Sequence, residues 1–372
     1  MRATTIFDVL VVYGDTLATS AMSPSASTGP FSQSAGCEYY NDAYGYLLAS
    51  CENANLRAAF TTSADIVGPG TCRSYWTYSK GVWQATERRG VAKIIFDKFA
   101  PSTAHRKRAR EILFSSGSIV PFNDPALYQL FFDKYDFFTH LSSYTIPTVA
   151  VEDDILSALS ELDQLMNSHP YPADFLSDFV LKDRYGSTGS HVYRIDSRGA
   201  SRIREIVGAN PKISFVLQPM VRFDQGGKGT LAQADIRLIF NSTKIIQTYL
   251  RVAKEGEFRC NGHYGSTTVY LTERDLPVAV RALAKHVVQE LPKNDSIYAL
   301  DFLLSNHGHP YLLEGNTGPG INWDANDPYD IRVTKGFIRK IVAELSRRVR
   351  VSERPHHRNI AISETGLSLI PS

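Results

Sequence analysis

The feature of this sequence that most constrains its fold is a pair of apolar runs, each holding one acid, on either side of a short polar turn. The stretch ALDFLLSNHGHPYLLEGNTGPG, residues 299–320, has Asp301 in the first run and Glu314 in the second. Two apolar runs joined by an Asn, His and Gly segment predict a β-hairpin. If Ser305 and Pro310 close its loop, Asp301 lies directly opposite Glu314 in the ladder.

Asn316 adds a third oxygen-bearing side chain to the face of the hairpin that carries both acids, because side chains alternate between the faces of a strand. Like charges that face each other destabilise a strand pair unless a positive charge lies between them. Mg²⁺ prefers oxygen ligands and keeps positions for water and substrate phosphates. We therefore predict that Asp301, Glu314 and Asn316 bind a metal. The alternative is a polar face on a solvated hairpin of different register, and a phosphate-binding element elsewhere would decide between the two.

The bulk composition is that of an ordinary soluble globular protein with two to three domains. The chain has 372 residues, of which 43% are hydrophobic and 21% charged. Its 40 Lys and Arg against 38 Asp and Glu give a net charge of +2, which provides no global field for a polyanion, so nucleic acid is not favoured as a partner. We interpret two local basic runs, residues 105–110 and 346–358, as a solvated helix face and a loose terminus.

The first residues and the cysteines indicate a cytoplasmic chain. The apolar stretch in MRATTIFDVLVVYGD is interrupted by Asp8 and is too short for a signal peptide or a membrane span, so we expect a first strand and no membrane partner. Four widely spaced cysteines without a CxxC pair predict free thiols rather than disulfides or a zinc site, and they are Cys37, Cys51, Cys72 and Cys260.

Apolar periodicity predicts a mixed α and β class, with an α/β domain at the amino terminus after a long loop at residues 16–36. Asp124 and Pro125 predict the start of a helix that runs toward Lys134. The other expected helices are residues 152–167, 276–289 and 329–347, and the expected strands are residues 91–97, 179–182, 213–217, 235–240, 244–251 and 267–271.

A lysine at the end of a strand, followed by a Gly, Ser and Thr loop, forms a candidate phosphate-binding element. Glycines let the backbone approach an oxyanion closely and direct N–H groups at it. The loop matches neither the Walker A pattern nor GxGxxG, and its alternative reading is a flexible hairpin turn. The metal-type oxygens downstream favour a nucleotide site. Its residues are Lys182, Gly186, Ser187, Thr188, Gly189 and Ser190.

A segment rich in anion-binding side chains, residues 247–265, lies between these two elements, and Arg237 precedes it on a neighbouring expected strand. Guanidinium groups are suited to planar recognition of carboxylate or phosphate. Solvated arginines on an edge strand would give the same pattern. The candidates in the segment are Arg251, Arg259, Asn261 and His263.

Over about residues 121–345 the chain resembles the ATP-grasp superfamily, in the branch that contains bacterial glutathione synthetase and the ribosomal-protein glutamate ligases. Each motif is weak alone, but their order is specific. The matching elements are, in chain order, Asp133-Lys134, the strand lysine with its Gly/Ser loop, Gln218-Pro219-Met220-Val221, residues 235–237, residues 251–261, and Asp301 followed by residues 314–320.

The resemblance implies an ATP-grasp fold of three parts with the nucleotide between two α+β subdomains. The expected divisions are an α/β amino-terminal substrate domain at residues 1–120, a central subdomain at 121–217, a carboxy-terminal subdomain with the metal site at 218–350, and a tail at 351–372.

The activity that the resemblance implies is an ATP-dependent, ADP-forming ligase that joins a carboxylate to an amine through an acylphosphate. Lys134 and Lys182 would contact the phosphates, and residues 186–190 would close over them. Asp301, Glu314 and Asn316 would hold two Mg²⁺ ions, with Mn²⁺ as an alternative. Gln218, Pro219, Met220 and Val221 would bind adenine. Arg251 would stabilise the transferring phosphoryl group, with Arg237, Arg259 and Asn261 close by.

Three departures from the family pattern remove no charged group needed for this chemistry: Pro219 replaces an acid, Ala299 a glycine, and His191 a loop glycine. The alternative from another class is a non-catalytic ATP-binding regulatory protein of the same fold. A ligase that modifies a protein or peptide tail is a further option. The retained lysines and metal positions favour the enzyme. Residues 1–120 match no pattern, so the amino acid or peptide substrate is not identified, and the resemblance leaves a homo-oligomer open.

Overall fold

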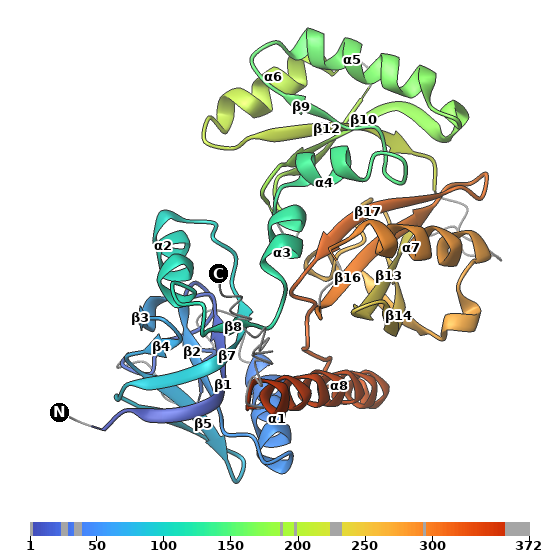
Figure 1. Ribbon diagram of the computed structural model, residues 1–372. Helices are drawn as coiled ribbons and strands as arrows, with labels where there is room; N and C mark the ends of the chain where they lie inside the picture. Colours follow the sequence, from blue (N-terminus) through green and yellow to red (C-terminus); the bar gives the residue numbers. More distant parts are fainter. Residues whose placement is uncertain are drawn as a thin grey trace, which may run out of the picture.

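The computed structural model describes residues 3–23, 29–32, 39–186, 189–196, 199–223, 233–292 and 295–353, and the strands among them form three sheets (Figure 1). The predicted mixed α and β class is confirmed. The sheets comprise residues 5–121, 149–221 and 234–316. None of the described helices combines the length and the apolar composition that a membrane crossing requires. The domain divisions expected from the sequence stay a prediction.

The amino-terminal sheet is built on β1 (Thr5–Tyr13), which pairs in parallel with β2 (Ala58–Thr62) on one side and β7 (Gly90–Lys98) on the other. Alternate β1 residues enter two cores. One core lies under α1 (Tyr40–Asn53) and the other under α2 (Ala104–Leu113). The remaining elements of this sheet are η2 (Ser63–Asp65), β3 (Ile66–Gly68), β4 (Thr71–Cys72), β5 (Tyr75–Ser79), β6 (Val82–Thr86) and β8 (Val120–Pro121).

The basic run at residues 105–110 is not a fully solvated face, and that interpretation is wrong for two of its arginines. Arg106 is buried and donates to Asp15 Oδ1 and Thr16 Oγ1, each at 2.7 Å. Arg110 forms an ion pair with the buried Asp97. Arg110 therefore fastens α2 to β7, and Arg106 fastens it to the segment that follows β1.

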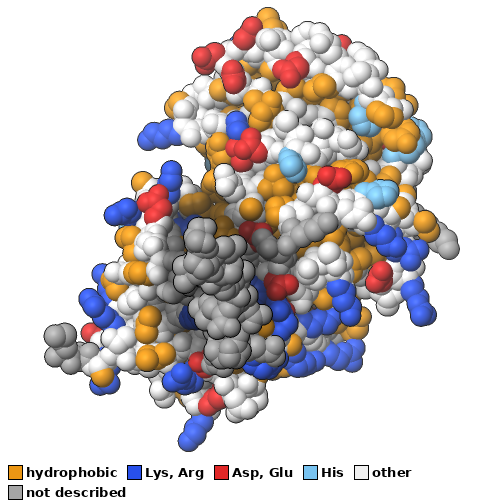
Figure 2. Space-filling model, viewed as in Figure 1, with side chains coloured by type: hydrophobic (Ala, Val, Ile, Leu, Met, Phe, Trp, Pro, Cys, Tyr) orange, Lys and Arg blue, Asp and Glu red, His pale blue; other side chains and the backbone are white. Residues whose placement is uncertain are grey.

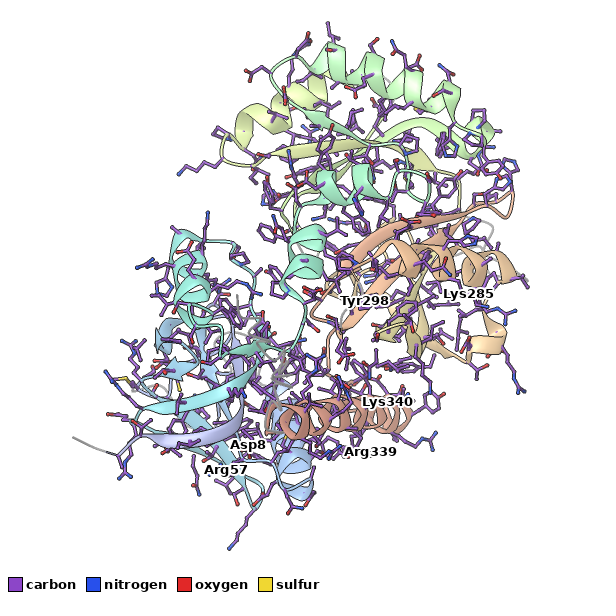
Figure 3. The ribbon with its side chains drawn as sticks, viewed as in Figure 1. Asp8, Arg57, Lys285, Tyr298, Arg339 and Lys340 are labelled. Carbon is purple, nitrogen blue, oxygen red and sulfur yellow. The ribbon has the colours of Figure 1, made fainter. Side chains whose placement is uncertain are left out.

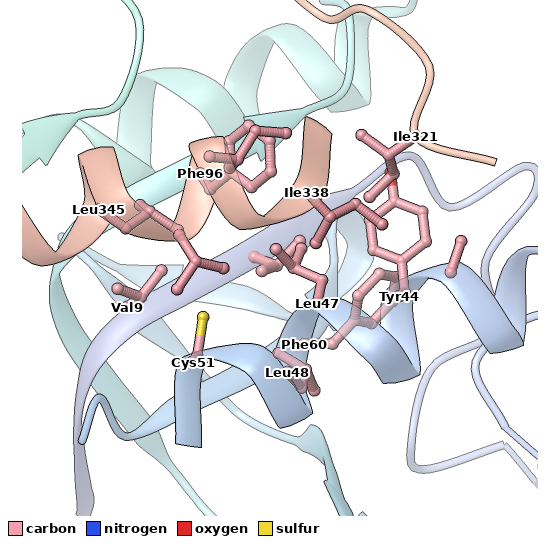
Figure 4. Close-up of a cluster of buried hydrophobic side chains, with 14 of the residues drawn as sticks. Val9, Tyr44, Leu47, Leu48, Cys51, Phe60, Phe96, Ile321, Ile338 and Leu345 are labelled. Atoms are coloured by element: carbon pink, nitrogen blue, oxygen red, sulfur yellow. The ribbon is translucent and has the colours of Figure 1, made fainter. Parts of the chain in front are cut away.

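The last helix, α8 (Pro328–Glu353), packs against α1 and completes the first core of the amino-terminal sheet. Figure 4 shows Ile338 and Leu345 of α8 among Val9, Leu47 and Cys51. All five side chains are buried, so this core joins the two ends of the described chain.

Polar contacts also attach α8 to α1 and β14 (Lys244–Val252), and Figure 3 labels the two α8 side chains that make them, Arg339 and Lys340. Arg339 donates to the Tyr46 hydroxyl at 2.9 Å, and Lys340 donates to the carbonyl of Ile246. Lys and Arg side chains gather over this helix in Figure 2. The interpretation of residues 346–358 as a solvated terminus is wrong for Arg348, which is buried and donates to Glu344 Oε1 at 2.7 Å.

The central sheet is antiparallel, and two helices pack on one face of it. Leu162 of α5 and Ile203 of α6 share a buried core with Leu217 of the sheet. The strands, in spatial order, are β11 (Val192–Ile195), β10 (Phe175–Asp183), β12 (Phe215–Val221) and β9 (Val149–Val151), and the helices are α5 (Ile155–Ser168) and α6 (Ala200–Ala209).

The helix expected to run from Pro125 toward Lys134 is instead two helices, α3 (Pro125–Phe132) and α4 (Lys134–His140). Asp133 causes the break, because its carboxylate accepts hydrogen bonds from the backbone N–H groups of Tyr135 and Asp136. An acid that caps a new first turn ends the helix before it.

The carboxy-terminal sheet is also antiparallel, and it confirms the expected strands. Its strands, in spatial order, are β15 (Thr267–Leu271), β14 (Lys244–Val252), β13 (Ala234–Asn241), β16 (Ile297–Leu304) and β17 (Pro310–Asn316), and α7 (Val278–Glu290), η4 (Gly262–Tyr264) and η5 (Glu273–Asp275) accompany them. The predicted pairing of Asp301 with Glu314 is present, but Leu304 rather than Ser305 pairs with Pro310. A β-bulge between Asp301 and Phe302 adds one residue to β17, so that Asp301 still pairs with Glu314 although the strands close one residue earlier than expected.

The tip of the β16–β17 hairpin is fastened to η3 (Pro172–Asp174) of the central part by one buried acid. Asp174 is 0% exposed and accepts hydrogen bonds from His307 Nδ1 at 2.5 Å, His309 Nδ1 at 2.8 Å and the Tyr311 hydroxyl at 2.7 Å. Burial alone would raise the pKa of Asp174, but these donors hold it below its ordinary value. The contact therefore joins the two sheets through a carboxylate that stays ionised.

The Asp174→Asn variant is expected to lose about 2–4 kcal/mol of unfolding free energy at pH 7, since an amide accepts through one oxygen only and cannot serve the buried Tyr311 hydroxyl and both histidines. Because folding lowers the pKa of Asp174, its contribution is complete above the ordinary carboxyl pKa and is lost as the pH falls below it. Urea unfolding measures both effects. The exposed Asp153→Asn is the control and should shift by less than about 0.5 kcal/mol.

Candidate functional site

A first cavity lies between the central and carboxy-terminal sheets, and we call it the hinge cavity. Its volume is about 160 Å³. Its apolar floor includes Ile146, Val180, Leu303 and Leu313. It gathers thirteen of the residues predicted for nucleotide, metal or catalysis, namely Lys134, Lys182, Gly186, Gly189, Ser190, Gln218, Pro219, Met220, Val221, Arg251, Arg259, Asn261 and Glu314.

The wall formed by β12 has an interrupted ladder where an adenine ring would need backbone donors and acceptors. Phe179 pairs with Pro219 and Phe175 with Val221, so three residues of β10 face Met220 alone. Such an irregularity leaves backbone groups outside the ladder. The strand predicted at residues 213–217 is observed as Phe215–Val221, so it contains all four expected adenine-binding residues.

Lys182, at the end of β10, lies near two other charged side chains of the hinge cavity. Burial lowers the pKa of Lys182 to about 8, with Glu314 opposing this shift and Lys134 adding to it. Lys134 donates to the carbonyl of Gly186. The first residues of α4 are held beside β10 because Arg184 donates to both Asp133 oxygens at 2.7 Å. Both predicted lysines thus reach the same cavity.

The Gly/Ser loop contacts the carboxy-terminal subdomain, although Ser187 and Thr188 lie outside the described residues. The Tyr264 hydroxyl donates to the carbonyl of Gly189 at 3.0 Å. Gly189 has a φ of +76°, and a Cβ there would lie 2.9 Å from the Tyr264 ring. His191 has a φ of +51°, a conformation that glycine adopts more readily. The histidine that replaces a family glycine thus keeps a glycine-like backbone.

A buried network of two acids and two arginines lies where the hinge cavity borders the carboxy-terminal sheet, a place that we call the junction. Asp301 is 2% exposed and accepts from Arg237 Nε and Nη2 and from Arg251 Nη2, each at 2.6 Å. Arg251 also donates to both oxygens of Asp235 at 2.6–2.7 Å. The register explains these pairs, because Arg237 lies opposite Asp301 and Asp235 lies opposite Arg251.

The positive charges beside Asp301 are therefore these two guanidiniums. Burial alone would raise the pKa of Asp301, but Arg237 and Arg251 hold it below its ordinary value. Asp301 lines neither cavity, whereas Glu314 and Asn316 line the second one. The three predicted metal ligands thus share the β16–β17 hairpin, with Asp301 beneath the arginines.

The donor set nevertheless fits a hard cation. Two carboxylates and an amide supply oxygens, and three hydrogen bonds leave acceptor capacity on Asp301. Asn316 Oδ1 accepts from Gly318 N at 2.7 Å, which orients the amide. Within the described ranges, no group of three His, Cys, Asp or Glu side chains is placed to hold a metal.

The second cavity, which we call the cleft, is larger, about 980 Å³, and extends from the junction to the amino-terminal domain. Arg237 and Asn316 line it. It shares five residues with the hinge cavity, and all five are predicted site residues: Lys134, Gly186, Arg251, Asn261 and Glu314. A ligand bound in the hinge cavity can therefore reach a ligand in the cleft across this group.

Arg259 is placed differently from the other predicted arginines. It lines the hinge cavity but not the cleft, and its guanidinium donates to both oxygens of Glu257 at 2.9 and 2.6 Å. It also lies 3.4 Å from the centre of the Tyr264 ring. This position braces the residue that contacts the Gly/Ser loop.

Lys98 is a residue of the cleft that the sequence analysis missed. It is the last residue of β7, and its ammonium donates to the carbonyl of Pro319 at 2.7 Å. Burial lowers the pKa of Lys98 to about 8. The available signal was its place at the end of an apolar strand, because ligands bind at the carboxyl ends of parallel strands.

The family model described as a RimK-like ATP-grasp domain matches residues 156–341, which is half of the chain. The chain belongs to the RimK-like ATP-grasp family. The resemblance found in the sequence is thereby confirmed. A similar protein, the probable alpha-L-glutamate ligase 2 of Shewanella frigidimarina, is 33% identical over 144 residues, which are 38% of this chain and 43% of that protein. The match spans less than half the length of that relative.

Solved structures show the ATP-grasp fold over nearly the whole of this RimK-like chain. D-alanyl-alanine synthetase A from Vibrio cholerae gives a TM-score of 0.56 at 14% identity, covering 94% of this chain and 100% of that one. D-cycloserine synthetase DcsG gives a TM-score of 0.56 at 15% identity, and the match covers 91% of this chain and 99% of that one. The likeness includes the amino-terminal domain, for which the sequence provided no match.

Proposed function

We propose that this RimK-like protein is an ATP-dependent, ADP-forming carboxylate-amine ligase. The observation that carries the proposal is the meeting of a narrow hinge cavity and a wide cleft at one charged group, which contains Lys134, Arg251 and Glu314. A nucleotide in the first cavity and a carboxylate in the second would react there.

The nucleotide would bind with its adenine against Met220 and Val221, where the ladder opposite β12 is interrupted. Lys182 and Lys134 would contact the phosphates, and the Gly/Ser loop would cover them while Tyr264 holds Gly189. Phosphoryl transfer needs positioning and charge neutralisation more than covalent chemistry from the protein.

The metal ligands would be Asp301, Glu314 and Asn316, and we propose two Mg²⁺ ions. When bound, such ions neutralise charge on the phosphate oxygens. The protein's own part would be to hold these oxygens on one hairpin, with Glu314 near Lys182, which would contact the same phosphates.

The reaction would proceed through an acylphosphate. A substrate carboxylate oxygen attacks the γ-phosphorus, the bond from that phosphorus to the β–γ bridging oxygen breaks, and ADP leaves. An amine nitrogen then attacks the acyl carbon, phosphate leaves and the amine releases a proton. Arg251, oriented by Asp235 and Asp301, would stabilise the negative charge of both steps, and Arg237 and Asn261 would line the same space.

The substrates would be an amino acid or peptide and an amine, in the cytoplasm. A protein or peptide tail as acceptor is a second proposal, since the cleft is wide and reaches the amino-terminal domain. The test is ADP release from ATP and Mg²⁺ with pooled amino acids and peptides. Release that depends on a substrate supports the ligase, whereas nucleotide binding without such release supports the regulatory alternative.

In this assay the Lys182→Met variant is expected to lose about 10²–10³-fold in turnover while it keeps its fold, because the aliphatic stem stays buried and the charge is removed. Lys212→Met is the control, since Lys212 is an exposed lysine of the same subdomain. Equal turnover of the Lys182 and Lys212 variants would contradict the assignment.

A further inference from the structure

The amino-terminal side of the cleft combines one cation with a group of aromatic rings. In the described part of the cavity lining, four cationic side chains are present, and three of them, Lys134, Arg237 and Arg251, belong to the junction. Lys98 is the fourth and comes from the amino-terminal sheet. Its surroundings therefore indicate what the far end of the cleft binds.

The topology of the sheet places Lys98 beside an aromatic residue. β1 and β7 are parallel, and Tyr13 pairs with Lys98 at their carboxyl ends. Ile94 and Phe96 enter the core under α1, so Lys98, two residues further on, lies on the same face as Tyr13. Both residues line the cleft.

Aromatic side chains continue from Tyr13 along this wall. The Tyr13 ring centre lies 5.4 Å from that of Tyr44 and 6.3 Å from that of Tyr40, and Tyr39 stacks on Tyr40 at 4.6 Å. All four tyrosines and Trp323 line the cleft. Tyr44 and Trp323 are themselves buried, so the apolar contact area for a flat or bulky side chain comes mainly from Tyr13, Tyr39 and Tyr40.

The charge of Lys98 is available to a ligand. The neighbouring Asp97 is paired with Arg110 of α2. Within the described ranges Lys98 makes no ion pair, and its hydrogen bond to the Pro319 carbonyl uses one of three ammonium donors. Asp97 offsets only part of the cost of burying this ammonium, since that carboxylate is paired with Arg110, and a ligand carboxylate would offset more of it.

Lys98 also lies next to the loop that follows the proposed metal ligand Asn316. A Cβ on Gly318 would be 3.7 Å from both Lys98 Nζ and Asn316 Oδ1. A carboxylate held by Lys98 would thus lie on the amino-terminal side of this loop, in the same cavity as Arg251 and Glu314.

We infer that the amino-terminal side of the cleft binds an amino acid, or the carboxy-terminal residue of a peptide, with an aromatic side chain, and that Lys98 binds its carboxylate. The use of this ligand as a substrate rests on the proposed function, whereas its binding does not. Glutamate fits this wall less well, because a second carboxylate would lie among aromatic rings with no second cation from the described amino-terminal residues of the lining.

The test is calorimetric titration of the whole chain with L-phenylalanine, L-tyrosine, L-tryptophan and L-glutamate, with Mg²⁺ and a non-hydrolysable ATP analogue present. The aromatic amino acids should bind more tightly than glutamate. The Lys98→Met variant should weaken that binding about 30-fold or more. Lys93→Met is the matched control, because Lys93 lies on the same strand and donates to a backbone carbonyl, that of Ser352 at 2.9 Å, but is exposed outside the cleft.

If the Lys98→Met variant folds poorly, a ligand that lacks the carboxylate tests the same contact on the unmodified chain. L-phenylalaninol should bind the unmodified chain about 30-fold more weakly than L-phenylalanine. Equal affinities for these two ligands, tighter binding of glutamate, or no binding of aromatic amino acids would overturn the inference. The proposed function is tested separately by ADP release, so aromatic binding without ADP release would contradict the ligase and leave this site assignment in place.

Discussion

The Glu314→Gln variant is expected to lose at least about 10³-fold in kcat, with little change in its unfolding free energy. Glu314 lines both cavities at the point where they meet and lies close enough to Lys182 to influence the pKa of that lysine. Glutamine keeps the volume and removes the negative charge that a divalent cation needs. The variant should also require more Mg²⁺ for half-maximal ADP release.

ADP release as a function of Mg²⁺ concentration, together with urea unfolding, measures both parts of this prediction. Glu290→Gln is the matched control, because Glu290 is an exposed glutamate at the end of α7 in the same subdomain. If Glu314→Gln kept a kcat within a factor of about ten of the control, the assignment of the β16–β17 hairpin to catalysis would be wrong.

The Asp301→Asn variant is expected to lose about 3–5 kcal/mol of unfolding free energy, the largest stability effect that we predict. Its carboxylate is the shared partner of Arg237 and Arg251, whose side chains are only 12% and 13% exposed. An amide has one acceptor oxygen, so a buried guanidinium would lose a partner. Because folding lowers the pKa of Asp301, the stabilisation is complete above the ordinary carboxyl pKa and is lost as the pH falls below it.

Urea unfolding at pH 7 tests this, with the exposed Asp153→Asn again as the control. A loss below about 1 kcal/mol would show that the arginines do not depend on Asp301, and that the carboxylate is free for a metal without cost to the fold.

The sequence allowed much of the carboxy-terminal half to be predicted, because its strands are apolar runs and most of them pair with the next strand along the chain as antiparallel neighbours. β15 was predicted with its observed bounds, and Asp301 was placed opposite Glu314. The closure of the hairpin was wrong, since the β-bulge beside Phe302 depends on packing that no local pattern records. The assumed pairing of Ser305 with Pro310 was off by one residue in the opposite sense to the bulge, so the two errors cancelled and Asp301 was still placed opposite Glu314.

The amino-terminal half could not be predicted to the same depth. Strands as short as β4 carry no periodicity, and the parallel pairs of β1 with β2 and β7 depend on contacts between distant segments. The packing of α8 on α1, and with it the completion of this core, is likewise a distant contact. Lys98 was missed because its importance depends on the loop at Pro319, more than two hundred residues further along the chain.

The charge network at the junction was seen as separate motifs in the sequence but not as a network. The pairing of Arg237 with Asp301, and of Arg251 with Asp235, follows from the order of β14, β13 and β16 in the sheet. That order cannot be read from residue spacing alone. The prediction that Asp301, Glu314 and Asn316 bind a metal stays a prediction, and the structure adds that Arg237 and Arg251 already pair with Asp301.

The central claim is that triphosphate chemistry occurs where the hinge cavity meets the cleft. A crystal structure of the chain with Mg²⁺ and a non-hydrolysable ATP analogue tests it most directly. The expected result is adenine against Met220 and Val221, phosphates beside Lys134 and Lys182, and Mg²⁺ bound by Glu314. A nucleotide bound elsewhere, or metal ions bound away from the β16–β17 hairpin, would contradict the account.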